Sequence, residues 1–163
     1  MEKGFEQGGE MKNELAECVF LIKEPLDLSA ESKFLEQSQP LQNYFDEPDE
    51  KLPLCVLYLD LETPEQVAND KFEVSVAANF SIIHRISPEE SRKSGLEKGK
   101  KCLEQFIDNI KRRQRNGTAL VPFYLNGEPE ITADTPNDID YEKINPAIAV
   151  ATVKFVANYI APA

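Results

Sequence analysis

Two long segments of alternating side chains constrain the fold of this chain more than any other feature. In residues 72–84, apolar residues and a terminal histidine occupy every second position over about thirteen residues. Residues 147–160 repeat the pattern, with small residues on the alternating face. Period-two alternation predicts a β-strand, and at roughly 3.3 Å per residue the first segment would span about 40 Å. Ordinary strands have about five or six residues, so such a strand is expected to bend or to project beyond its own domain.

A third strand and two helices are predicted around this pair. The nearly continuous apolar run at 54–62 indicates a strand covered on both faces. An apolar stripe at helical spacing between Met11 and Ile22 predicts a helix that ends by Pro25. The stripe of the second helix consists of Leu96, Leu103, Phe106, Ile107 and Ile110.

The ends of the second helix carry recognisable signals. Ser87, Pro88 and Glu90 form a capping-box pattern that predicts its start. Gly117 follows a run of basic residues and predicts its C-cap. Gly95 and Gly99 weaken the first half, which suggests that the Ser87 cap serves a short first turn with a kink after it.

The order of these elements defines the expected architecture. Asn126-Gly127 predicts a β-hairpin over 123–131, and 132–145 is expected to be an acidic loop. Most strands follow one another without a crossover helix. We therefore expect an α+β fold: an antiparallel or mixed β-sheet with long strands and helices packed on one face. Residues 1–9 are expected to form a flexible tail, and residues 10–163 a single domain.

The sequence contains no recognisable catalytic or metal centre. Cys18, Cys55 and Cys102 are widely spaced, and buried reduced thiols are the preferred interpretation. The only histidine, His84, ends a strand and is assigned a structural or surface role. The acidic positions Asp134, Asp138, Asp140 and Glu142 depart from calcium-loop spacing and are interpreted as a solvated loop. We therefore expect no cofactor, no metal and no enzymatic activity.

The distribution of charge suggests a binding surface. The formal net charge is −11, yet residues 88–117 hold nine bases and five acids. Dipole compensation at a helix end would explain the 111–115 part of this cluster, and a contact with acidic protein surface is the alternative. The interface candidates are Arg92, Lys93, Lys98, Lys100, Lys101, Lys111, Arg112, Arg113 and Arg115. The acidic total argues against wrapping nucleic acid.

Two further features concern the cellular location. No 18-residue apolar run is present, so no membrane partner is expected. The polar, acidic start of the chain is unlike a signal peptide, and secretion by that route is not expected.

The succession of elements resembles the tail-terminator, tail-completion and head–tail connector (neck) proteins of tailed bacteriophages. The resemblance covers roughly residues 10–160: a leading helix, a strand from the Leu-Pro-Leu at 52–54, the strand at 71–84, the helix at 96–110 and the strand at 147–160. It implies a virion protein that forms a ring, commonly a hexamer, and assembles in the cytoplasm of a bacterial host. The implied partners are other copies, tail-tube and neck proteins, and DNA as non-specific passing cargo. The resemblance implies no catalytic residue.

Two features agree with that resemblance, and two other classes of function stay open. Acidic side chains suit a channel through which DNA passes, and long strands can complete a neighbour's sheet. An acidic monomeric inhibitor or adaptor, comparable to an immunity protein on a basic enzyme, is the main alternative, because complementary charge accelerates encounter. An enzyme that uses dispersed residues is the third.

Overall fold

The structure, a computed structural model, describes residues 2–45, 47–61, 64–134 and 148–162. It is an α+β fold, as the sequence predicts: one mixed sheet of seven strands with two long helices. The helices are α1 (Glu2–Phe20) and α2 (Arg92–Asn116). The strands are β1 (Phe34–Glu36), β2 (Leu54–Leu61), β3 (Glu65–Ala68), β4 (Lys71–Arg85), β5 (Tyr124–Leu125), β6 (Glu130–Asp134) and β7 (Ile148–Pro162). No helix of the described chain is both long and apolar enough to cross a membrane.

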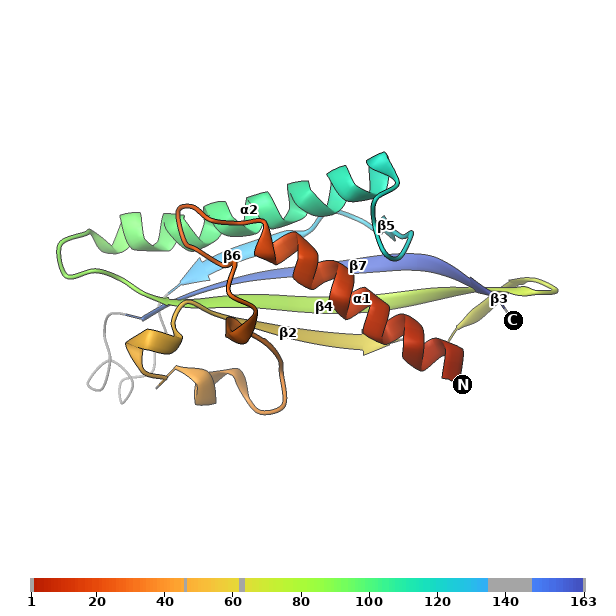
Figure 1. The fold of residues 1–163 in the computed structure, drawn as a ribbon, viewed down its shortest axis with the longest axis horizontal. Coiled ribbons are helices and arrows are strands. Elements are labelled where there is room, and N and C mark those ends of the chain that lie inside the picture. Colours follow the sequence, from red (N-terminus) through yellow and green to blue (C-terminus); the bar gives the residue numbers. More distant parts are fainter. Residues whose placement is uncertain (1, 46, 62–63, 135–147, 163) are drawn as a thin grey trace.

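The two long alternating segments form the centre of the sheet. β4 and β7 pair antiparallel along their whole lengths, from Lys71 opposite Pro162 to Arg85 opposite Ile148. β2 lies on the other side of β4, and β1 pairs parallel with β2 at one edge. β5 and β6 lie beside different parts of β7 at the other edge. The end that carries the β3–β4 turn extends beyond the helices, as the strand lengths predict (Figure 1).

Both helices pack on the same face of this sheet, which we call the helix face. Phe80 of β4 and Phe106 of α2 have ring centroids 4.7 Å apart at the middle of the core, and Phe155 of β7 contacts Phe106 from the neighbouring strand. Met11 and Leu15 of α1 belong to the same buried cluster. The even-numbered side chains of β4 and the odd-numbered ones of β7 face this core. The alternation therefore predicted the buried face correctly.

Among the described residues, the opposite face, which we call the open face, is covered only at one end. Residues 41–53 include two short 3-10 helices, Leu41–Tyr44 and Asp49–Lys51. Tyr44 and Phe45 from this segment pack with Ile83 and Ile148 in a second, smaller buried cluster. The β2 segment Leu54–Leu57 is buried on both faces for this reason, whereas its second half is exposed or half-buried.

The two glycines of α2 allow close packing, and the expected kink is wrong. α2 runs without interruption from Arg92 to Asn116. A Cβ atom at Gly99 would lie 2.8 Å from the Cβ of Ala151, and one at Gly95 would lie 2.7 Å from the Ile86 side chain. The helix backbone therefore sits against the sheet where only a hydrogen atom fits. Sheet packing compensates for the roughly 1 kcal/mol by which each glycine disfavours a helix.

Replacing Gly99 by alanine is expected to destabilise the fold by about 1–3 kcal/mol, despite the better helix propensity of alanine. The new methyl group would overlap Ala151, whose own Cβ is fixed on a central strand. Urea unfolding would measure the change. Glu104→Ala on the exposed side of the same helix is the control; a Gly99→Ala protein as stable as wild type would contradict the close packing.

Both helices begin at residues other than those that the sequence predicts. Ser91, not Ser87, caps α2 and accepts a hydrogen bond from the Ser94 N–H at 3.1 Å. The capping-box hydrogen bond of residues 87–90 does form, from the Ser87 N–H to Glu90 Oε1 at 2.7 Å, but it closes an isolated turn before the helix.

α1 begins at Glu2, so residues expected as a tail have helical backbone. Adding a residue to an existing helix fixes the backbone torsions of that one residue and gains one hydrogen bond. Starting a helix fixes the torsions of several residues for its first bond. Gly117 caps α2 as predicted, with φ of 70°.

The predicted hairpin over 123–131 is wrong. β5 and β6 each pair with β7 rather than with each other. Gly127 has the expected positive φ of 82°, but the turn redirects the chain along the edge of β7. A fifteen-residue strand offers a longer row of backbone partners than a two-residue strand does. β6 also replaces the start of the acidic loop expected at 132–145, and the remainder of that segment lies outside the described residues.

Candidate assembly surface

The only histidine is buried in the core rather than placed at a reactive site. The His84 side chain is 2% exposed and lies against Gly99 of α2, where a glycine Cβ would be 3.1 Å from Nε2. Neither ring nitrogen has a hydrogen-bond partner of good geometry among the described residues. Burial lowers the pKa of His84; the backbone of Arg85 and the carboxylate of Glu90 oppose this effect, and Lys98 reinforces it. The ring is therefore held neutral as a packing element.

This buried ring predicts a loss of stability in mild acid. A histidine whose pKa is lower in the folded state binds its proton more readily when the chain unfolds, so stability falls as the pH drops below the unfolded pKa of about 6.5. Because a single proton is involved, the free energy of unfolding can change by at most about 1.4 kcal/mol per pH unit. Urea unfolding from pH 7.5 to 5 would measure it. His84→Gln should remove part of the slope, and an identical slope in the variant would contradict this assignment.

The three cysteines are buried free thiols, as the sequence interpretation proposed. Burial is the largest cause of the raised pKa of Cys18, Cys55 and Cys102. Among the described residues, no group of three or more His, Cys, Asp or Glu side chains is arranged to hold a metal ion. Of the acidic positions at 134–142, Asp134 forms an ion pair with Arg92 at 3.6 Å and the others lie outside the described residues.

The basic interface candidates divide into groups with different environments. Arg113 is engaged inside the protein: its guanidinium donates two hydrogen bonds of 2.8 Å to the fully buried Glu14 carboxylate. That hydrogen-bonded carboxylate raises the pKa of Arg113. Lys98 forms an ion pair of 2.7 Å with Glu90. The exposed candidates at other positions along α2 are Lys101, Lys111, Arg112 and Arg115.

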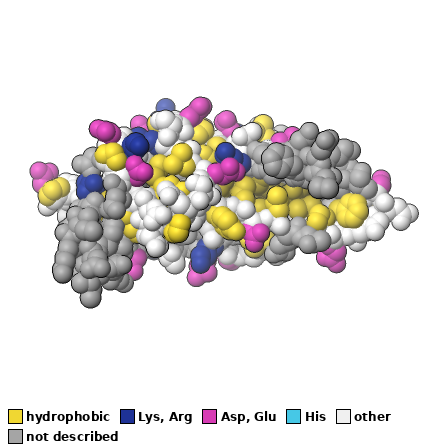
Figure 2. All heavy atoms as spheres, turned by 90° about the horizontal axis from the view of Figure 1, so that it is seen from below, with side chains coloured by type: hydrophobic (Ala, Val, Ile, Leu, Met, Phe, Trp, Pro, Cys, Tyr) yellow, Lys and Arg dark blue, Asp and Glu magenta, His cyan; other side chains and the backbone are white. Residues whose placement is uncertain are grey.

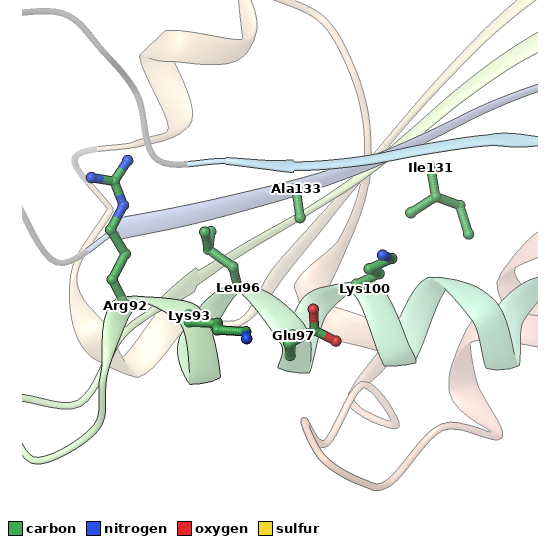
Figure 3. Close-up of a pocket in the computed structure, with 7 residues that line it drawn as sticks. All are labelled: Arg92, Lys93, Leu96, Glu97, Lys100, Ile131 and Ala133. Carbon is green, nitrogen blue, oxygen red and sulfur yellow. The ribbon is translucent and has the colours of Figure 1, made fainter.

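Three candidates do lie together, on a groove between the start of α2 and β6. The groove has a volume of about 480 Å³. Its lining residues are Arg92, Lys93, Leu96, Glu97, Lys100, Ile131 and Ala133. Leu96 and Arg92 point from the helix toward the strands, while Lys93, Glu97 and Lys100 stay close to the helix (Figure 3). The groove thus combines an apolar floor with a predominantly cationic border. We call it the α2–β6 groove.

The uncovered part of the open face carries large side chains that the sequence interpretation did not single out. Tyr58, Tyr124 and Ile160 are 44%, 55% and 51% exposed. The half-buried Val156 lies opposite Ala77 between them in the strand register. Hydrophobic side chains gather in a band along the long axis of the molecule on the side that faces down in Figure 1 (Figure 2).

A hydrogen-bond cluster fixes one end of this face. The Tyr124 hydroxyl and the Asn158 amide, at 3.0 Å, both donate to the same carboxylate oxygen of Glu73. The bond from Tyr124 is the main reason that the pKa of Glu73 is lowered. Three strands are thereby joined across the open face, so Tyr124 is held in position although it is exposed. The even-numbered apolar residues of 147–160 were the sequence signal that could have identified this surface.

Known proteins provide no independent assignment for this surface. No protein-family model matches the chain, and no curated protein matches it. The arrangement of its own residues therefore has to support any functional conclusion.

Proposed function

We propose that this chain is a structural subunit that acts by protein–protein assembly, forming a ring comparable to the tail terminators and head–tail connectors of tailed bacteriophages. The observation that carries the proposal is the half-covered sheet: helices pack on one face, while Tyr58, Tyr124 and Ile160 of the other remain in contact with water. Exposed apolar groups on a rigid sheet are typical of surfaces that bind other proteins.

The net charge of the chain, −11, agrees with the same class of function. The open face itself carries both signs of charge: Asp60, Glu73 and Glu130 are acidic, and Lys71 and Lys154 are basic. A strongly acidic protein repels DNA and prevents its retention in a channel. In this proposal DNA is passing cargo, and the protein partners are other copies together with tail-tube and neck proteins. The site of action is the virion, after assembly in the bacterial cytoplasm.

Mass measurement by light scattering, over a series of protein and salt concentrations, tests this proposal directly. We expect particles that weigh several times the 18.4 kDa of one chain. Their population should rise with protein concentration, by mass action. A strict monomer under every condition would contradict the proposal.

One observation favours a second candidate, an acidic inhibitor or adaptor for a basic partner. Residues 24–50 contain eight acids and one base, a net charge of −7. Such a surface would accelerate encounter with a basic protein. A monomeric chain that binds a basic enzyme tightly would support this second candidate instead.

A further inference from the structure

In the part of the chain that the structure describes, the sheet ends on two sides in strands whose outer edges pair with no further strand. Among the described residues, β6 pairs only with β7, and β1 pairs only with β2. The strand order places these two strands at opposite edges of the sheet. An edge strand presents unpaired backbone N–H and C=O groups, which another strand can satisfy. The chain therefore has two different surfaces of the same general kind.

The sequence segments that contain the two edges have net charges of opposite sign. Residues 91–101, which begin α2 beside β6, hold five bases and one acid, a net charge of +4. Residues 24–50, which contain β1, have a net charge of −7, from eight acids and one base. Lys93 and Lys100 on the α2–β6 groove form no ion pair with another described residue. Lys93 and Lys100 are therefore available to carboxylates from outside, whereas Arg92 is engaged with Asp134.

The side-chain alternation of β1 places a carboxylate on the helix face, the same face as the α2–β6 groove. Phe34 lies on the helix face, because its ring packs against Phe20 and Phe80 at centroid distances of 5.8 and 6.2 Å. Glu36, two residues further, lies on the same face. Its side chain is 61% exposed, and its Oε2 forms an ion pair of 3.6 Å with Nζ of Lys12 in α1. Ile131 and Ala133 place the floor of the α2–β6 groove on the helix face as well.

The strand directions determine how two copies would join. β6 runs antiparallel to β7, β7 antiparallel to β4, and β4 antiparallel to β2, while β1 is parallel to β2. β1 and β6 therefore run in opposite directions. A rotation about an axis parallel to the strands keeps every strand direction and keeps the helices on one side. It would bring β1 of the next copy against β6 as an antiparallel strand.

We infer that copies of this chain join head to tail by adding β1 of one copy to the β6 edge of the next. In this contact Glu36 of β1, and Glu31 of the 3-10 turn directly before it (Glu31–Lys33), face Lys93 and Lys100 of the neighbouring α2–β6 groove. This inference rests on the proposed function and names the contact that would build the ring. Each interface uses two different surfaces, so the arrangement propagates from copy to copy and closes into a ring when the rotation allows it. The partner is a second copy of this chain.

Charge reversal tests the inference. Lys93→Glu combined with Lys100→Glu is expected to weaken self-association about 100-fold, because like charges would then meet across the contact. Lys111→Glu combined with Arg112→Glu makes the same charge change on the same helix, away from the groove, and should leave self-association within about threefold of wild type. Light scattering at low and moderate salt would measure both.

A complementary pair of variants makes the test specific. Glu31→Lys combined with Glu36→Lys should also weaken self-association, and mixing this protein with the Lys93→Glu, Lys100→Glu protein should restore it. When the two proteins alternate, the acidic groove of the Lys93→Glu, Lys100→Glu protein meets the basic β1 segment of the other variant. The unchanged basic groove of that variant meets the unchanged acidic β1 segment of the first. Amide hydrogen exchange should show new protection within residues 130–133 in the assembled protein, since edge amides of β6 would be paired there.

The outcomes separate this inference from the proposed function. An oligomeric wild type whose assembly survives the Lys93→Glu, Lys100→Glu change overturns the head-to-tail contact and leaves the proposed function standing. Variants that both dissociate but fail to associate when mixed also overturn the contact. A wild-type chain that stays monomeric at every concentration and salt level overturns the proposed function and the contact together.

Discussion

Replacing Glu14 by alanine is expected to reduce the free energy of unfolding by about 3–5 kcal/mol. The Glu14 carboxylate is fully buried, accepts two bonds of 2.8 Å from Arg113, and accepts a third of 2.9 Å from the Leu120 N–H. Removing it leaves a guanidinium and a backbone donor without their partner in a largely dry site. Urea unfolding monitored by circular dichroism would measure the loss.

The matched control is Glu17→Ala on the same helix, where the side chain is exposed. It makes the same chemical change and should alter stability by less than about 0.5 kcal/mol. The Arg113→Ala protein should lose a similar amount to Glu14→Ala, and the double variant should lose less than the sum of the two. Additive losses would contradict a direct coupling between α1 and α2 through this ion pair.

Replacing Phe106 by alanine is the second change with a large expected effect, also a loss of about 3–5 kcal/mol. The ring is fully buried between Phe80 and Phe155, with centroid distances of 4.7 and 6.0 Å. Deleting it would remove apolar contact with both central strands and leave a cavity that strands paired along fifteen residues cannot readily close.

A graded series makes the Phe106 test quantitative. Phe106→Leu retains much of the volume and is expected to lose less than Phe106→Ala, because the residual cavity is smaller. Leu120→Ala removes apolar surface at a position that is 54% exposed, and should lose less than about 0.5 kcal/mol. Equal losses for the leucine and alanine variants would contradict the cavity explanation. Thermal or urea unfolding would rank the three proteins.

The candidate surface was only partly predictable, because some of its residues are defined by distant partners. The basic cluster in α2 was evident from the sequence, but Arg113 was placed in the interface set although it binds Glu14, 99 residues earlier. Lys93 and Lys100 were in the same set, yet the strand that completes their groove was expected to be part of a hairpin and a loop. Local pattern identified the cations and could not assign their partners.

Local side-chain patterns were sufficient to predict two long strands, the buried face of each, the apolar stripes of two helices and the C-cap at Gly117. These features follow from side chains only a few positions apart, so they can be recognised in a single chain. Long-range packing governs the pairing of the strands, the start of α2 and the accommodation of Gly95 and Gly99 in a helix. It also leaves the open face covered by described residues at one end only. Those outcomes depend on competition between distant segments for the same backbone groups and the same apolar surface, and local sequence does not contain that competition.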